Sequence, residues 1–208
     1  QGKIMKTLRG AKNSVVKLGI KRSTSQDLLY FNVTRGDVPV NSVDVAYVVR
    51  EGVGYIKVNK FARTTYNEFI TAIAKLKQQN CKSFIIDLRG NTGGYMDAAI
   101  NMINEFMANG RLIVYTEGKA FPRNDVYANG TGTCQDAPIV VLTDEFSGSA
   151  SEIFAGAIQD NDRGLIIGRR TYGKGLVQSQ IPLSDGSALR LTIARYYTPS
   201  GRCIQKPY

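Results

Sequence analysis

Histidine is absent from the 208 residues of this chain. Imidazole is the side chain that most often takes the proton from a catalytic nucleophile, and it is also the commonest metal ligand. A nucleophile in this protein therefore needs a different base. No cluster of carboxylates replaces histidine as a metal site, so the sequence implies neither a metal nor an organic cofactor.

Long apolar runs are missing as well. No stretch approaches the roughly 20 apolar residues that a membrane helix requires, and residues 1–20 lack the apolar core of a signal peptide. We therefore expect no direct membrane insertion. The chain starts at Gln1 without an initiator methionine, so we interpret it as part of a longer protein and expect any export signal outside it.

Cysteine is scarce and widely spaced. Cys81, Cys134 and Cys203 are odd in number and show no C-x-x-C spacing for metal or redox chemistry. We expect small thiols that are buried or partly exposed. A disulfide between Cys134 and Cys203 would fit an oxidising compartment, and the sequence leaves it open.

The net charge of +10 comes from 27 basic and 17 acidic residues. A basic balance of this size can indicate nucleic-acid binding. Here the lysines and arginines are spread over the whole chain, with no basic helix and no zinc or RNA-binding motif. A solvated surface explains the charge, and we predict no nucleic-acid partner.

The apolar pattern alternates between strands and helices after residue 50. β-branched runs end in glycine-rich or small-residue turns, and apolar residues at helical spacing follow them. The predicted strands are residues 53–58, 83–88, 111–116, 138–143, 165–168, 176–181 and 188–197, and the predicted helices are residues 65–78, 98–106 and 152–159. Residues 1–50 predict short β-rich pieces, and residues 117–136 predict a long loop or flap. The order predicts an α/β fold with its chemistry at strand-to-helix turns.

Ser149 lies in the small-residue turn SGSASE, residues 147–152, after a strand and at the start of a helix. A serine in such a turn projects from the sheet, and the free amides of the helix N-terminus lie beside it. The turn departs from the G-x-S-x-G elbow, because serines replace both glycines. Ser149 and Glu152 also satisfy S-x-x-E, so a helix cap without chemistry explains the same segment.

Lys174, which lies between two glycines, is the candidate base for that serine. A serine hydroxyl needs a base to become a good nucleophile, and an amine acts as a base only when it is neutral. Burial among apolar neighbours favours the neutral amine. Phe146, Leu176 and Val177 are the candidate neighbours, and a surface lysine in a glycine turn is the alternative.

A glycine-rich loop, GNTGG at residues 90–94, follows the strand at residues 83–88. Backbone amides in such a loop can point at a developing negative charge. A phosphate or coenzyme loop is the alternative, although both G-x-G-x-x-G and the Walker pattern G-x-x-x-x-G-K-S/T are absent.

These segments together resemble the tail-specific, or C-terminal processing, serine proteases. The resemblance runs from about Val53 to the end of the chain. It rests on the motifs DLRGNTGG at residues 87–94, SGSASEIFAGAIQD at residues 147–160 and TYGKGLVQ at residues 171–178. The family implies a core related to the crotonase and Clp protease folds, built from stacked β-α units. It also implies a Ser–Lys mechanism without histidine.

The resemblance assigns roles residue by residue. Ser149 matches the nucleophile and Lys174 the general base, 25 positions further on. Gln178 matches a glutamine that orients the lysine. Gly148 stands where members of the family often carry alanine, which is a minor departure.

The oxyanion hole and one acidic position also carry over. The amides of Ala150 and of Gly93 or Gly94 match the oxyanion hole. Asp160 matches an acidic position sometimes assigned to the site. We expect Asp160 to give structural support, because a carboxylate close to the lysine would favour the charged amine.

The first 43 residues resemble the last part of the PDZ domain that such proteases carry. The matching pieces are LRG at residues 8–10 and FNVTR at residues 31–35. The PDZ half that captures a substrate's C-terminal carboxylate is expected upstream of Gln1. We therefore predict a truncated PDZ-like segment at residues 1–43 and a serine protease catalytic core at residues 44–208.

The sequence thus predicts a serine endopeptidase that cleaves unstructured or C-terminal segments of proteins through an acyl-enzyme. Its partners would be polypeptides that are unfolded or have accessible C-termini, and oligomerisation stays open. The resemblance implies a location in the bacterial cell envelope or periplasm. The alternatives are a non-catalytic peptide-binding scaffold on the same fold and a crotonase-type acyl-CoA enzyme.

Overall fold

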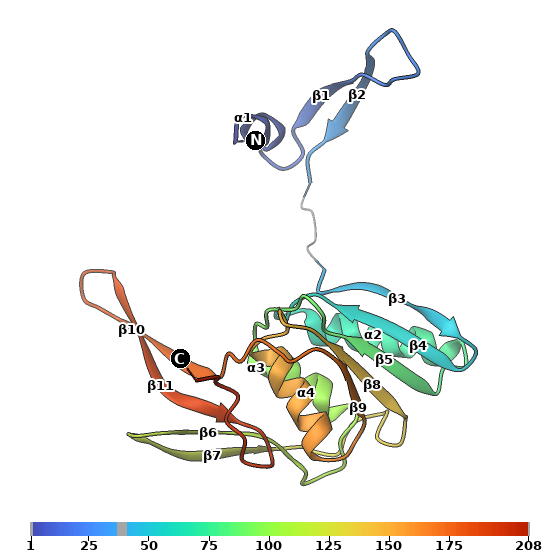
Figure 1. Ribbon diagram of the computed structural model, residues 1–208. Coiled ribbons are helices and arrows are strands. Elements are labelled where there is room, and N and C mark those ends of the chain that lie inside the picture. The colour runs from blue at the N-terminus through green and yellow to red at the C-terminus, as the bar shows by residue number, and fades with distance from the viewer. Residues whose placement is uncertain (1, 37–40, 208) are drawn as a thin grey trace. The chain divides into compact units, whose positions relative to one another are not determined.

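The computed structural model describes residues 2–36 and 41–207, so Gln1 lies outside the described residues. The chain divides into two compact units, Gln1–Val40 and Asn41–Tyr208. Each unit has its own secondary structure, and each is described by itself (Figure 1).

The first unit consists of one short helix and one hairpin. Helix α1 (Gly2–Leu8) precedes strands β1 (Val15–Ile20) and β2 (Leu29–Thr34), which pair antiparallel. The Arg35 guanidinium donates to the main-chain oxygen of Leu8 at 2.8 Å, which ties the hairpin to the helix. The prediction of β-rich structure throughout residues 1–50 is wrong for α1, because its largely exposed side chains carry no amphipathic pattern. The PDZ assignment stays a prediction.

The second unit contains a five-stranded sheet in the order β3-β4-β5-β8-β9. Its strands are β3 (Val43–Arg50), β4 (Val53–Val58), β5 (Ser83–Asp87), β8 (Ile139–Thr143) and β9 (Leu165–Gly168). Strands β4, β5, β8 and β9 are parallel, and β3 is antiparallel at the edge. Because parallel strands end at one edge of the sheet, the loops after β5 and β8 lie together, where α/β proteins bind ligands.

A four-stranded antiparallel sheet has the order β10-β11-β6-β7. Its strands are β6 (Leu112–Gly118), β7 (Phe121–Tyr127), β10 (Leu176–Pro182) and β11 (Ala188–Tyr197). The prediction of a loop at residues 117–136 is wrong for its first half, because β6 continues to Gly118 and β7 pairs with it, whereas residues 128–136 form no helix or strand. Strand β7 is an edge strand with mostly exposed side chains, so its sequence lacks the apolar signal of a buried strand.

Helix α2 (Thr65–Gln78) packs against β3 and β4, and helices α3 (Met96–Asn104) and α4 (Ala150–Asp160) lie between the two sheets (Figure 1). Helix α4 contacts β9 of one sheet and β6 of the other, and α3 packs against both α2 and α4. The predicted α/β fold is confirmed, and α2 has the predicted bounds.

Four phenylalanines meet at the centre of this core. The ring of Phe106 packs edge-on against Phe69, Phe84 and Phe154, with centroids 6.2, 6.4 and 6.5 Å away. These rings come from α2, β5 and α4 and from the segment after α3. Because the site loops leave β5 and enter α4, this cluster fixes the frame on which the site is built.

The three cysteines are all free. Cys81 and Cys134 are buried and Cys203 is exposed, as expected for small thiols, and the Cys134–Cys203 disulfide is not formed. Within residues 2–36 and 41–207, no helix combines the length and the apolarity needed to cross a bilayer.

The first prediction concerns stability. Replacing Phe106 by alanine removes a fully buried ring that three others contact, so the free energy of unfolding should fall by about 3–5 kcal/mol. Urea unfolding monitored by circular dichroism measures the change. The control is Phe121→Ala, which removes a ring that is 45% exposed and should cost less than about 1 kcal/mol. Equal losses in the two variants would contradict the assignment of Phe106 to the core.

Candidate active site

The loop after β5 and the turn before α4 are joined by hydrogen bonds. The Ser147 hydroxyl donates to the Leu88 main-chain oxygen at 2.8 Å. The Asn91 main-chain oxygen accepts from the Gly148 amide at 3.0 Å and from the Ser151 hydroxyl at 2.9 Å. Two segments nearly 60 residues apart in sequence therefore form one rigid unit.

Asp144 and Asn91 hold the two ends of this unit. The Asp144 carboxylate accepts from the Gly90 amide at 2.9 Å and from the Ser147 amide at 3.1 Å. The side-chain amide of Asn91 donates to the Val58 main-chain oxygen at 2.9 Å, from a fully buried position. The glycine-rich loop is thus fixed on one side to β4 and on the other to the serine turn.

Ser149 has a backbone conformation that L residues rarely adopt, with φ of 54° and ψ of −113°. A residue that only caps a helix takes the extended conformation, whereas strained backbone of this kind costs about 1–3 kcal/mol and clusters at functional sites. The capping box that the sequence predicts is also present, and the Glu152 carboxylate accepts from the Ser149 amide at 2.8 Å. The cap alone does not require the strain.

Gly93 lies directly against the serine turn. A Cβ at Gly93 would be 2.7 Å from the Ser149 Cβ and 2.6 Å from the Gly148 main-chain oxygen. The same Cβ would be 3.1 Å from the Ala150 amide nitrogen. The glycine-rich loop therefore lies within van der Waals distance of the serine and of the first amide of α4.

The candidate oxyanion donors are not equivalent. The Gly93 amide already donates to the Asn91 side-chain oxygen at 2.9 Å. The amides of Ala150 and Gly94 have no hydrogen-bond partner among residues 2–36 and 41–207. Gly94 is exposed, and a Cβ there would lie 2.0 Å from the Phe61 main-chain oxygen, so only glycine fits. Ala150 and Gly94 are therefore the two candidate donors whose amides have no hydrogen-bond partner in the described part of the chain.

Glu152 connects the serine turn to the lysine loop. Its buried carboxylate accepts from the Ser149 and Lys174 amides at 2.8 Å through one oxygen, and from the Gly173 amide at 2.6 Å through the other. The amide nitrogens of Ser149 and Lys174 therefore share a single acceptor. The S-x-x-E spacing predicts the first contact, but no sequence signal indicates the other two.

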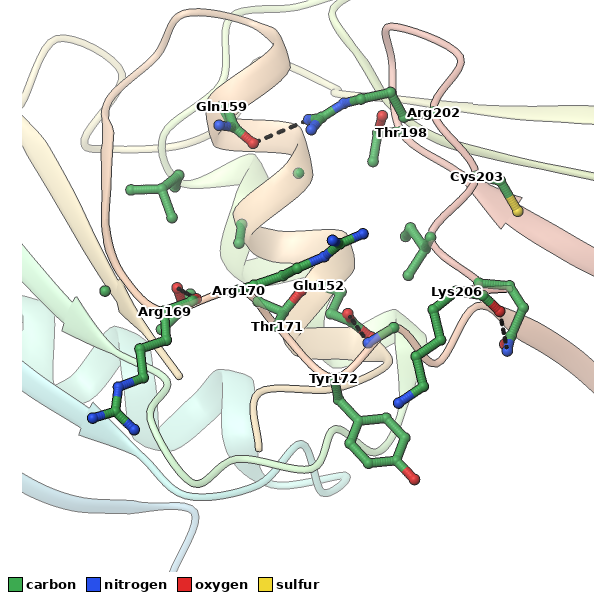
Figure 2. Close-up of a pocket in the computed structure, with 18 of the residues that line it drawn as sticks. Glu152, Gln159, Arg169, Arg170, Thr171, Tyr172, Thr198, Arg202, Cys203 and Lys206 are labelled. Carbon is green, nitrogen blue, oxygen red and sulfur yellow. Dashed lines mark hydrogen bonds between the residues drawn. The ribbon is translucent and has the colours of Figure 1, made fainter. Parts of the chain in front are cut away.

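Glu152 also lines a pocket of about 890 Å³ that opens between α4, residues 168–173 and residues 202–207 (Figure 2). Figure 2 shows its carboxylate reaching the backbone beside Tyr172, with Arg170 and Lys206 over the same hollow. The Lys206 amide donates to the Gly173 main-chain oxygen at 3.1 Å. Residues 205 and 206 therefore also hold the lysine loop, since the Gly175 amide donates to the Gln205 side chain at 3.0 Å.

The Lys174 side chain is exposed, and the predicted burial among Phe146, Leu176 and Val177 is wrong for this structure. Phe146 is itself 58% exposed on the turn before α4. The lysine loop is anchored through its two glycines and the Lys174 amide, which leaves the amine outside the core. Within the described part of the chain, no hydrogen bond joins the amine to Ser149.

Gln178 lies on β10 immediately after a β-bulge between Val177 and Gln178. Its side chain is exposed and faces the same pocket as Gly94. No hydrogen bond between Gln178 and Lys174 is formed among the described residues. Its position brings it to the glycine-rich loop, and its orienting role stays a prediction.

Asp160 is at the far end of α4, about 16 Å along the helix from Ser149 at 1.5 Å per residue. Its carboxylate accepts from the Ser200 hydroxyl at 2.6 Å and pairs with Arg202. Burial opposes its ionisation, but the hydrogen bonds from Ser200, Thr198 and Arg202 outweigh burial and hold the pKa of Asp160 below its usual value. The residue ties α4 to residues 200–202, and its supporting role in the site stays a prediction.

Asp87 is the most densely hydrogen-bonded carboxylate next to the glycine-rich loop. It accepts from the Tyr55 hydroxyl at 2.6 Å and from the Arg89 guanidinium at 2.7 Å, and Lys57 is 3.4 Å away. Burial would raise the pKa of Asp87, but the Arg89 and Tyr55 hydrogen bonds and the Lys57 charge outweigh it, so the pKa falls to about 2. Burial, together with the hydrogen bond to Asp87 and the charge of that carboxylate, raises the pKa of Tyr55 to about 12, although the Arg89 guanidinium acts in the opposite direction. The ionised cluster fixes where the loop leaves β5.

The arrangement combines a strained serine, two free amides and a lysine loop held to the serine by one carboxylate. A hydroxyl beside free amides can attack a carbonyl carbon and stabilise the oxyanion that forms. Within the described part of the chain, no group of three or more histidine, cysteine, aspartate or glutamate side chains is placed to hold a metal ion.

Comparison with known families points to one protein group. Residues 52–207 match the family described as Peptidase family S41. A carboxyl-terminal-processing protease of Synechocystis is 36% identical over 202 residues, which is 96% of this chain and 47% of that protein. A carboxy-terminal-processing protease of Bartonella bacilliformis is 38% identical over 205 residues, which is 95% of this chain and 46% of that protein.

A solved structure shows the same relationship. The photosystem II D1 C-terminal processing protease is 31% identical, with a TM-score of 0.73 over 94% of this chain and 54% of that one. The chain therefore spans about half the length of the curated relatives that it matches.

The second prediction concerns acid stability. The pKa of Asp87 is about 2 in the folded chain against about 3.9 in an unfolded one. A depressed pKa stabilises the fold at higher pH, so about 2 kcal/mol should be present above pH ~5 and lost as the pH falls towards ~2.

Urea unfolding of the parent and of Asp87→Asn at a series of pH values tests this. The parent should lose more stability than the variant on acidification, and the two should converge at the acid end. Asp162→Asn, which removes an exposed carboxylate, is the control and should behave like the parent. A parent and an Asp87→Asn variant with parallel pH profiles would contradict the account.

Proposed function

Because the chain belongs to peptidase family S41, we propose that it carries the catalytic core of a serine endopeptidase that cleaves unstructured or C-terminal segments of proteins. The observation that carries the proposal is the strained backbone of Ser149 beside the free amides of Ala150 and Gly94. A hydroxyl in that place can meet a carbonyl carbon whose oxygen points at the two amides.

In the proposed mechanism, the neutral Lys174 amine takes the proton of the Ser149 hydroxyl while the serine oxygen attacks the substrate carbonyl. The amides of Ala150 and Gly94 donate to the oxyanion. The carbon–nitrogen bond then breaks, and Lys174 returns its proton to the leaving amine. Water attacks the acyl-enzyme with Lys174 again as base, which releases the acid and restores the serine.

Because the Lys174 side chain is exposed, we propose that the bound substrate itself shields the amine from water. A peptide strand that covers the exposed amine removes water from it, and desolvation favours the neutral form that a base requires. The Glu152 carboxylate holds the lysine loop at the serine turn, because it accepts hydrogen bonds from three backbone amides of these two segments. We propose that Gln178 orients the amine once the substrate is bound and that Asp160 supports α4.

The two rival functions receive less support. A peptide-binding scaffold would not need strain at Ser149, and a crotonase-type acyl-CoA enzyme would not need Glu152 to join the lysine loop to the serine. The cell-envelope location and the contribution of a PDZ domain stay predictions. Cell fractionation and activity of the full-length protein test them.

The third prediction tests the dyad. Digestion of an unstructured protein by the chain, followed by mass spectrometry, should show cleavage that falls by at least about 10³-fold in Ser149→Ala and in Lys174→Ala. Ser187→Ala and Lys119→Ala change an exposed serine and an exposed lysine in turns and should keep the parent rate. Cleavage retained in Lys174→Ala would contradict the proposed base.

The fourth prediction tests the oxyanion geometry. Gly93→Ala places a methyl group against the Ser149 Cβ and the Gly148 oxygen, and it also strains a backbone with φ of 103°. The turnover number should fall by about 10²-fold or more, as for the loss of an oxyanion donor. Gly186→Ala also adds a methyl group at positive φ, but in open space, and should leave turnover unchanged. Equal activity of Gly93→Ala and the parent would contradict the proposal that the scissile carbonyl binds between Ser149 and the glycine-rich loop.

A further inference from the structure

A second hollow lies beside the glycine-rich loop, with a volume of about 500 Å³. It is lined by Phe61, Gly94, Tyr95, Gln178, Gln180 and Arg190. Gly94 supplies one of the two free amides, and its neighbour Gly93 lies against the Ser149 side chain. The hollow therefore begins one residue away from contact with the candidate nucleophile.

The β10–β11 hairpin forms one wall of this hollow and extends beyond the helices (Figure 1). Gln180 and Arg190 are directly opposite each other in the strand register, and Gln178 is opposite Thr192. Residues two apart on a strand share a face, so the three long polar side chains lie on one face. All three of these residues also line the hollow, so the face that they share is the one turned towards it.

The opposite face of the hairpin is apolar. Ile181 pairs directly with Leu189, and Leu191 lies two residues further along β11. These side chains are 42%, 49% and 46% exposed, so they do not join the core. The hairpin is thus amphipathic, and its polar face is the one turned towards the glycine-rich loop.

The charged side chain that lines the hollow, Arg190, is positive. No acidic side chain lines it, and Arg190 has no carboxylate partner within residues 2–36 and 41–207. A second cation lies at its aromatic wall, because the Arg63 guanidinium is 5.4 Å from the centroid of the Tyr95 ring. An unpaired guanidinium binds a carboxylate through charge-assisted hydrogen bonds.

We propose that Arg190 is a specificity-determining residue that binds a substrate carboxylate close to the cleaved bond. The carboxylate comes from an acidic side chain or from the C-terminus of the substrate, and Gln180 offers it a further amide donor. This inference rests on the proposed function and adds to it a class of substrate, peptides that carry a negative charge next to the scissile bond.

The test compares matched peptides. At each position near the scissile bond, one peptide carries glutamate and its partner glutamine, and a further pair differs in a free or amidated C-terminus. In one of these pairs the acidic peptide should have the higher kcat/KM by about fivefold, the upper range for an exposed ion pair. High salt should reduce that ratio.

Variants assign the preference to Arg190. The ratio should fall to about one in Arg190→Gln and should invert in Arg190→Glu, which should favour a lysine peptide. A misfolded hairpin cannot produce that inversion. Arg111→Gln removes an exposed arginine that does not line this hollow and should keep the parent ratio.

Two results would overturn the inference. One is a parent ratio of about one in every pair, and the other is a ratio that survives Arg190→Gln. Both results are compatible with cleavage of neutral peptides by the parent, so they would contradict the role of Arg190 without contradicting the proposed endopeptidase function. If the parent cleaves nothing, fluorescence anisotropy of the same labelled peptides replaces the rates. Acidic peptides that bind better to the parent but not to Arg190→Gln support the carboxylate site, and equal binding removes it.

Discussion

The carboxylate of Glu152 is the interaction on which the site depends. It is buried at the start of α4 and accepts the amides of Ser149, Gly173 and Lys174. A buried carboxylate is stable only when hydrogen bonds compensate its lost hydration. Three amides from two loops meet that requirement, so the same bonds that satisfy the charge also hold the lysine loop beside the serine turn. The strained backbone of Ser149 persists because its surroundings fix it from several sides.

The two sheets and the aromatic cluster provide the frame for that interaction. Parallel strands β5 and β8 end side by side, which brings the glycine-rich loop to the serine turn. Gly93 and Gly94 allow the close approach, because a side chain at either would collide with the serine turn or with Phe61. The consequence is that Gly93 lies against the strained serine, and that the amides of the residues that follow each of them, Gly94 and Ala150, have no partner within residues 2–36 and 41–207. Such preorganised donors are the usual source of oxyanion stabilisation.

Local patterns in the sequence predicted the α/β fold and most of its elements, because β4, β5 and β8 bury apolar side chains in alternation and α2 carries its buried residues at helical spacing. They missed β7, whose exposed edge position gives no apolar signal, and α1, whose side chains are largely exposed. The family resemblance carried by three motifs predicted that Ser149, Lys174 and the glycine-rich loop belong to one site. Neither the local patterns nor the resemblance could predict that the Lys174 side chain is exposed. They also could not predict that the Gly93 amide donates to the Asn91 side chain, or that the Glu152 carboxylate accepts from the Gly173 amide. Exposure and hydrogen bonding of this kind depend on how the whole chain folds.

The central claim is that Ser149 forms a covalent acyl-enzyme with the lysine loop as its partner. The most direct measurement mixes the chain with a cleavable peptide, quenches the mixture in acid and maps any acyl adduct by mass spectrometry. The account predicts an increment equal to the N-terminal substrate fragment on the peptide that contains Ser149. Products that form without any adduct, or an adduct that maps to another residue, would contradict it.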